Sequence, residues 1–346
     1  MPHPSLAEQF RGHFGHRDHL YGVLLDDLAR DLDAGGVTER ICRGYEDVTR
    51  GAAVQLRLLA GIFRIVLRGD APELERFYPS LGGSASPQDI WPVLQPVLEA
   101  HADELHDALA RPPQTNEVGR SACLAIGLFE AVRRTGLPRI RLLEPGASAG
   151  LNLNVDRYRI TGPEWSWGPA TSEVVLDTQA TGVQPESLTI VDRRGCDLDP
   201  VDASSAEGGR YLTSFVWPFT LDRHARLAGA LTVARSHPVT VERATASDWL
   251  GRQLASAPAS DVLTVVWQSI TQQYWPQAES ARVDDVVAAA RTRMPLVHLT
   301  MEGVPPRQTG GGYDIARFGP ELALDGDVIA RSHHHGLPVV LSSVVE

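Results

Sequence analysis

The chain has 346 residues, of which 43% are hydrophobic and 22% charged, a composition that is typical of a folded globular protein and excludes extensive disorder. Its formal net charge of −11 disfavours non-specific binding to nucleic acid, because phosphate backbones repel a negative surface. The sequence contains no lysine, which excludes catalysis through a lysine Schiff base.

The cysteines and the hydropathy pattern indicate the cellular compartment of the protein. Cys42, Cys123 and Cys196 are far apart and form no C-x-x-C pair, so neither a disulfide framework nor a cysteine zinc site is expected. No stretch resembles the apolar core of a signal peptide or reaches the roughly 18 apolar residues of a membrane span. We therefore expect a cytoplasmic protein with no nucleic-acid partner and no membrane contact; the sequence specifies no oligomeric state.

Residues 1–136 are predicted to form an all-helical N-terminal region. Apolar residues recur with helical spacing over 21–32 and 52–67. A further helix is expected over 119–134, with Asn116 or Thr115 as its cap and Gly136 as its stop. Polar residues ahead of that helix, among them Asn116, Glu117 and Arg120, could line a pocket or cap the helix.

From residue 139 onward, apolar runs alternate with helical patterns, which predicts βαβ units and a mostly parallel sheet. The expected strands cover 139–144, 187–198, 238–244, 262–270 and 295–303, and the expected helices cover 219–236, 247–256 and 280–293. Three later segments, 313–319, 328–333 and 337–344, suggest strands with short connections that close the sheet in antiparallel fashion. We thus expect a helical domain over 1–136 and an α/β domain over 137–346, with an inserted loop or hairpin at 158–186.

The motif EPGASAG, residues 144–150, follows the first expected strand and allows two interpretations. GASAG fits the G-x-S-x-G pattern of serine hydrolases, with Ser148 as nucleophile and a downstream histidine as base. However, in that fold most of the sheet precedes the serine, whereas residues 1–136 here are predicted to be helical. Glu144 would also place a carboxylate beside the developing oxyanion, where negative charge is unfavourable.

The second interpretation is a cofactor-binding turn. Glu144, at the end of a strand, could bind a cationic or hydroxyl-bearing group, while Gly146 and Gly150 would let the backbone approach a ligand closely. The turn resembles the E/D-x-G-x-G-x-G motif of class I S-adenosylmethionine methyltransferases, with Ser148 in place of the middle glycine. The alternative role of Glu144 is to cap the following helix.

Later segments resemble the same enzymes in the same order. The resemblance implies that Asp197, at the end of the second strand, binds the ribose hydroxyls, although Asp192, Asp199 or Asp202 could serve instead.

After the third strand, the resemblance implies that Asp248 accepts from the adenine amino group and that Trp249 lies beside the ring; a simple helix start with Ser247 or Asp248 as its cap is the alternative. After the fourth strand, Gln268 and Tyr274 would contact the methyl group and the substrate.

Five segments resemble, in order, a bacterial family catalogued as domain of unknown function 2332. They are EPGASAGLNLNVDRY, QTNEVGRSA, RRGCDLDPVD, FVWP and HHHGLPVV. The resemblance implies a class I methyltransferase-like Rossmann fold, and with the strand pattern above we expect a mostly parallel sheet with an antiparallel C-terminal strand pair. From the ordered set of motifs we expect an S-adenosylmethionine-dependent methyltransferase that acts on a small molecule and in which Gln268 or Tyr274 orients the acceptor. The alternatives are a hydrolase that uses Ser148 and a non-catalytic protein that retains the fold.

The triplet His333-His334-His335 raises the question of a metal site. Adjacent side chains of a strand point to opposite faces, so three consecutive histidines on a strand could converge on one ion only at a bulge. On this argument no metal site is expected.

Overall fold

The computed structural model describes residues 4–14, 18–114, 116–303 and 313–342. The chain forms two compact units. One comprises Met1–Thr115 with Ala206–Ala225, and the other comprises Asn116–Ser205 with Arg226–Glu346. The division therefore lies at 115/116 rather than at 136, because helix α7 (Ser121–Thr135) packs against strands of the sheet.

All secondary-structure elements described before residue 139 are α-helices or 3-10 helices, as expected. The α-helices of the first unit are α1 (Leu6–Phe14), α2 (Leu20–Asp33), α3 (Val37–Ile41), α4 (Val54–Arg68), α5 (Trp91–Ala100), α6 (Ala102–Ala108) and α8 (Ala206–Ser214). Helices α2 and α4 confirm the two helical patterns. Their apolar faces form the core of this unit, in which Leu28, Leu58 and Phe63 are fully buried. Helix α8 joins the unit by packing against α4.

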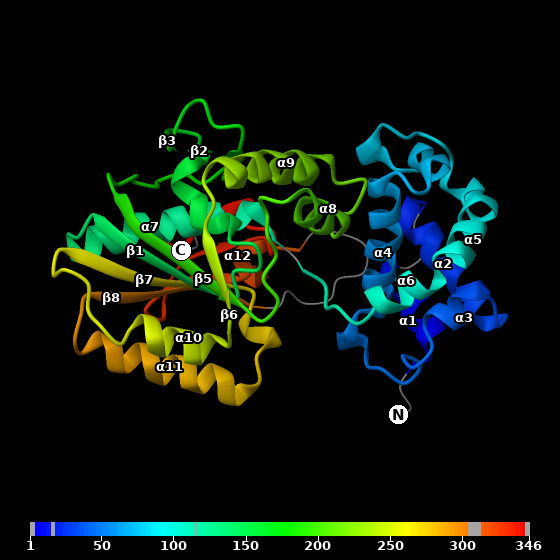
Figure 1. Cartoon of the computed structure of the whole chain (residues 1–346). Coiled ribbons are helices and arrows are strands. Elements are labelled where there is room, and N and C mark those ends of the chain that lie inside the picture. Colours follow the sequence, from blue (N-terminus) through cyan, green and yellow to red (C-terminus); the bar gives the residue numbers. More distant parts are fainter. Residues whose placement is uncertain (1–3, 15–17, 115, 304–312, 343–346) are drawn as a thin grey trace. The chain divides into compact units, whose positions relative to one another are not determined.

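The second unit contains an eight-stranded sheet in the order β11-β10-β9-β8-β7-β1-β5-β6 (Figure 1). Its strands are β1 (Arg139–Pro145), β5 (Thr189–Asp197), β6 (Thr240–Arg243), β7 (Val262–Ser269), β8 (Leu296–Glu302), β9 (Glu321–Leu324), β10 (Asp327–Ser332) and β11 (Val339–Leu341). The first five are parallel and confirm the five expected strands. Every residue of β7 is buried, as in parallel sheets that are covered on both faces.

Helices cover both faces of this sheet (Figure 1). Helices α10 (Ala246–Gln253) and α11 (Gln277–Arg291) pack on one face, where Leu143, Val266 and Trp249 belong to one buried cluster. Helix α7 packs against β8 and β9 on the other face. Together with α9 (Leu221–Ser236), helices α10 and α11 confirm the three expected helices.

The C-terminal part differs from the expectation in two ways. Three antiparallel strands, β9 to β11, close the sheet instead of a pair. The expected strand at 313–319 is wrong, because Ile315–Phe318 form the short helix α12, in which the Asp314 side chain accepts from the Arg317 amide. The last expected strand is β11, and its residues 343 and 344 lie outside the described part.

The segment at 158–186 forms a separate three-stranded sheet in the order β3-β2-β4, which confirms an inserted hairpin and adds one strand. Its strands are β2 (Arg159–Gly162), β3 (Trp165–Trp167) and β4 (Val175–Asp177). The rings of Trp165 and Trp167 lie edge-on to Phe129 of α7, so this small sheet is anchored on α7. Among the residues described, no helix combines the length and apolar character that crossing a bilayer requires.

Candidate functional site

The order of the parallel strands identifies one edge of the sheet as a candidate ligand site. The chain runs from β1 outward through β5 to β6, then returns to the other side of β1 with β7 and β8. Ligands of such sheets bind beyond the carboxyl ends of the strands, where this reversal occurs. Here the carboxyl ends of β1, β5, β7 and β8 carry Glu144, Asp197, Gln268 and Glu302.

Glu144 is the most perturbed of these groups. Its side chain is 3% exposed, and burial raises the pKa of its carboxyl to about 8, with a smaller raising effect from Asp197. Asn152, Trp267 and Arg120 lower this pKa, but by less than burial raises it. The carboxyl is therefore mostly protonated near pH 7.

The hydrogen bonds around Glu144 are incomplete. Asn152 donates to Oε1 at 3.4 Å, and the Ser121 hydroxyl fixes the Asn152 amide by donating to its Oδ1 at 2.7 Å. Glu144 Oε2 and the indole Nε1 of Trp267 are buried, and neither forms a hydrogen bond of good geometry with a described residue, although the indole lies close enough to the carboxyl to lower its pKa. Because orphaned buried polar atoms are costly and uncommon, this pair marks a position where a ligand or water would be stabilised.

Asp197 holds the turn that contains Ser148. Its Oδ2 accepts from the Ser148 amide and its Oδ1 from the Asp199 amide, each at 2.9 Å. Ser148 has a left-handed backbone with φ of 52°, and these bonds help to hold that conformation. A carboxylate offers about four acceptor positions, so Asp197 retains capacity for a further donor.

The two glycines of this turn make room for protein side chains. Gly146 and Gly150 have φ of 74° and 70°, a region that favours glycine. A Cβ at Gly146 would lie 2.5 Å from Thr271 Cγ2, and one at Gly150 would lie 2.7 Å from Val239 Cγ2. Where each glycine lacks a side chain, the turn therefore packs against Thr271 or against β6 and the residue before it, and no space for a ligand is left there. The segment that follows the turn is the 3-10 helix Leu151–Arg157.

Gln268 links two neighbouring side chains. Its Oε1 lies 3.1 Å from His298 Nε2, and its Nε2 donates to Glu302 Oε1 at 3.3 Å. Burial lowers the pKa of His298 to about 4 and raises the pKa of Glu302. The neutral imidazole and the Glu302 carboxyl therefore fix both ends of the Gln268 amide.

Arg120 connects three segments at the same edge and belongs to the group expected to line a pocket. It is 8% exposed and donates to the backbone oxygens of Ser269 and His334, both at 3.1 Å. It follows Glu117, whose side chain caps the 3-10 turn Val118–Arg120 by accepting from Gly119. The cap is therefore Glu117 rather than Asn116, and the other expected candidate, Thr115, lies outside the described residues.

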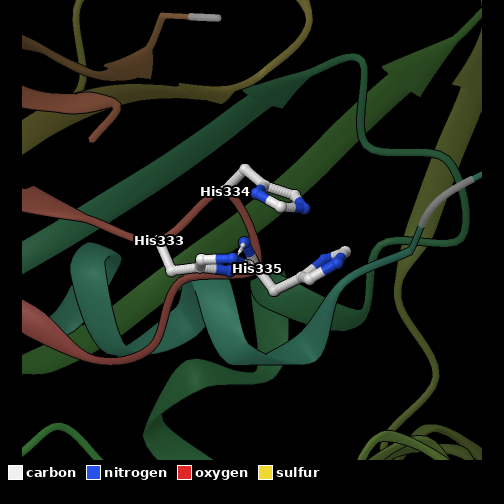
Figure 2. Close-up of side chains that lie close together, drawn as sticks. All are labelled: His333, His334 and His335. Carbon is white, nitrogen blue, oxygen red and sulfur yellow. Dashed lines mark hydrogen bonds between the residues drawn. The ribbon is translucent and has the colours of Figure 1, made fainter. Parts of the chain in front are cut away.

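The three consecutive histidines converge, contrary to the expectation. Strand β10 ends at Ser332, so His333, His334 and His335 lie in a turn, where side chains need not alternate. Their ring centroids are 3.9 Å apart for the first pair and 4.0 Å for the second. One ring nitrogen from each lies within 4.8 Å of the other two, and Figure 2 shows the three imidazoles grouped on this turn.

Comparison with known proteins identifies the family. A family model described as "Uncharacterized protein conserved in bacteria (DUF2332)" matches residues 6–340. The chain belongs to DUF2332. The match confirms the resemblance noted from the sequence motifs and spans both compact units of this DUF2332 member. Neither the curated proteins nor the solved structures that were compared contain a match to the chain.

The remaining candidates in this DUF2332 chain are Tyr274, Trp249 and Asp248. Tyr274 is 76% exposed, and Trp249 is fully buried with its indole donating to Glu242 Oε1 at 3.1 Å. Asp248 is exposed in the first turn of α10, whose cap is Thr245 rather than Ser247 or Asp248 itself. Among the described residues, no hydrogen bond joins Tyr274, Asp248 or Trp249 to Glu144.

Gly146→Ala tests whether Thr271 fills the space beside the turn of the DUF2332 chain. We expect the free energy of unfolding to fall by about 2–3 kcal/mol, from the left-handed backbone and the overlap with Thr271 Cγ2. In a Thr271→Ser background, which removes Cγ2 but keeps the hydroxyl that donates to Glu302, the same change should cost only about 1–2 kcal/mol. Urea denaturation of the four proteins measures both values; equal losses in the two backgrounds would contradict this packing.

Proposed function

We propose that this protein binds S-adenosylmethionine at the carboxyl edge of β1, β5 and β7 and transfers its methyl group to a small molecule. The observation that carries the proposal is the buried Glu144 carboxyl, with its orphaned Oε2, at the point where the strand order reverses. The parallel order β6-β5-β1-β7-β8 also supports it, since it matches the first five positions of a doubly wound Rossmann sheet. The antiparallel β9 departs from that sheet at the sixth position.

The charge of the cofactor suits the site. A protonated carboxyl with a pKa of about 8 and an orphaned oxygen is stabilised as a carboxylate when a cation approaches it. S-adenosylmethionine carries a sulfonium and an ammonium group, and either supplies such a cation. Arg120 lies near enough to lower the Glu144 pKa. Its guanidinium also donates to two backbone oxygens, so its charge does not serve Glu144 alone. A ligand cation would therefore stabilise the carboxylate further.

Ser148, Asp197 and Asp248 would each contact a different part of the cofactor. The Ser148 turn would line the cofactor, and the remaining acceptor capacity of Asp197 would serve the ribose hydroxyls. Asp248, exposed at the start of α10, is available to the adenine amino group, whereas the buried Trp249 would support α10 from the core.

The bound cofactor supplies an activated methyl group, so the chain mainly has to align the acceptor and exclude water. Gln268 suits a positioning role because its amide is fixed by His298 and Glu302. The exposed Tyr274 would have to reach the acceptor from the following 3-10 turn.

Ser148 supports a second candidate function, a hydrolase. Its positive φ of 52° after a strand resembles the strained turn of a nucleophile elbow. Against it, Asp197 accepts from the Ser148 amide and Glu144 lies on the adjoining strand end, so two carboxyl groups would face a developing oxyanion. Labelling by a fluorophosphonate probe that is lost in Ser148→Ala would establish the hydrolase and displace the methyltransferase.

Equilibrium dialysis with labelled S-adenosylmethionine and S-adenosylhomocysteine tests the proposal. We expect saturable binding of one ligand per chain, and at least a roughly tenfold loss of affinity in Asp197→Asn, since a charged acceptor is replaced by a neutral one. Asp261→Asn, which alters an exposed ion pair with Arg139 at the opposite edge of the sheet, is the matched control and should bind like the wild type. Absence of binding by the folded protein would remove the proposal, and binding without methyl transfer to any acceptor would favour the non-catalytic alternative.

A further inference from the structure

We propose that His333, His334 and His335 bind a divalent transition-metal ion and that Glu117 orients one of these ligands. The three imidazoles lie on the turn between β10 and β11 (Figure 2). This inference is independent of the proposed methyltransferase function, because none of the four residues is assigned to the cofactor.

The spacing of the rings is close to that of a metal site. The three candidate nitrogens lie within 4.8 Å of one another, whereas ligands at tetrahedral zinc, with bonds of about 2.0–2.1 Å, are about 3.4 Å apart. The difference is small enough for rotation of the imidazoles, which are only half-buried. The turn itself is pinned, since Gly336 donates to the His333 oxygen at 2.7 Å and the His333 amide donates to Pro338 at 3.2 Å.

Glu117 gives His335 the environment of a metal ligand. Its carboxylate is 4% exposed, and Oε2 lies 3.1 Å from His335 Nδ1, although the contact is bent from ideal hydrogen-bond geometry. Its Oε1 accepts from the Gly119 amide at 3.2 Å. A histidine that binds a metal usually directs its other nitrogen to a carboxylate or carbonyl, which fixes the tautomer. A proton on Nδ1, directed to Glu117, would make Nε2 the atom of His335 that binds the ion.

Tyr313 contacts His334 in a way that resembles the contact of Glu117 with His335. Its hydroxyl accepts from the His334 amide at 3.1 Å and lies 3.5 Å from His334 Nδ1. An Nδ1 proton directed to this hydroxyl would leave the Nε2 of His334 for the ion.

His333 requires the largest rearrangement. Its Nδ1 accepts from the His335 amide at 3.2 Å. Metal binding would either replace that hydrogen bond or move the proton to Nδ1 and use Nε2.

The ligand set indicates the class of ion. Imidazole nitrogens suit zinc, copper, nickel and iron, whereas magnesium and calcium prefer oxygen ligands. Three protein ligands leave at least one coordination position for water or for an oxygen atom of a substrate. The site would therefore be an open one, bound through three neutral imidazoles.

Zinc titration of the full-length chain tests this site. The protein is purified without a polyhistidine tag, stripped with a chelator and titrated with Zn²⁺ in competition with a chromophoric chelator. We expect one ion per chain, and at least a hundredfold loss of affinity in His334→Ala/His335→Ala. Glu117→Gln should lose roughly 10- to 100-fold, the usual effect of removing a partner of a ligating histidine. His237→Ala, at an exposed histidine that precedes β6, is the control and should bind as the wild type does.

Three adjacent histidines can also chelate metal without a built site, and the same titration separates the two cases. Unchanged zinc affinity in Glu117→Gln, or equal affinity of the urea-unfolded chain, would identify the triplet as an adventitious chelator and overturn the proposal. Circular dichroism establishes whether each variant folds. Should Glu117→Gln not fold, Tyr313→Phe decides: a several-fold loss of affinity supports the oriented site, and no loss overturns it.

Discussion

Between pH 5 and pH 8.5, wild-type protein is expected to lose roughly 3–4 kcal/mol more of its free energy of unfolding than Glu144→Gln. The folded pKa of Glu144 is raised from 4.5 to about 8. A raised pKa means that the folded state holds the proton more tightly, so its contribution is complete below about pH 4.5 and is lost as the pH rises through about 8. Glutamine mimics the protonated carboxyl, keeps an acceptor for Asn152 and cannot ionise.

Urea denaturation at several pH values measures this difference. Glu164→Gln, at an exposed glutamate between β2 and β3, is the matched control and should follow the wild-type profile, since its carboxyl stays in water in both states. Parallel profiles for wild type and Glu144→Gln would show that Glu144 is not a buried neutral acid.

Gly336→Ala is expected to reduce the free energy of unfolding by about 4 kcal/mol or more. Gly336 has φ of 85°, which costs an alanine about 1–2 kcal/mol. Its Cβ would also collide with the backbone of Gly119 and Arg120, and backbone atoms cannot move aside as a side chain can. The change would thus separate the histidine turn from the 3-10 turn Val118–Arg120 and its cap Glu117.

Gly136→Ala isolates the packing contribution to this loss. Gly136 ends α7 with φ of 70°, and among the described residues no neighbouring atom lies within 4 Å of the position that an alanine Cβ would take. Only the backbone cost of about 1–2 kcal/mol therefore applies. Thermal and urea unfolding of both variants give the difference, which should exceed about 2 kcal/mol. Equal losses would contradict the close packing of the two turns.

The parallel half of the sheet could be predicted from the sequence because its strands are buried on both faces. Such strands are unbroken apolar runs, and VLTVVWQS of β7 is the clearest case. The antiparallel end of the sheet is harder to predict from the sequence. β9 has four residues, too few for a convincing period, yet the Asp325-Gly326 turn after it, with φ of 55° and 92°, is a hairpin signal. Helix α12 is equally short, and only its cap Asp314 marks it.

The candidate site could be predicted only in part. The position of Glu144 at a strand end follows from the hydrophobic pattern, but its raised pKa depends on burial among Asn152, Trp267 and Arg120, which are distant in sequence. The sequence also does not show why the turn contains glycine, because either a ligand or the Thr271 side chain could occupy the space that a Cβ at Gly146 would fill.

The convergence of the three histidines could not be predicted because it depends on where β10 ends. Had β10 continued through His335, neighbouring imidazoles would have pointed to opposite faces of the sheet.

We propose that a ligand cation binds beside the neutral Glu144 carboxyl, and proton release on binding tests this contact most directly. Calorimetric titration of S-adenosylmethionine at pH 7, in phosphate and in Tris, reports protons released from the difference in binding enthalpy. Because a group with a pKa of about 8 is mostly protonated at this pH, wild type should release about one proton more per site than Glu144→Gln. The same proton count for both proteins, or no binding by the wild type, would contradict the account.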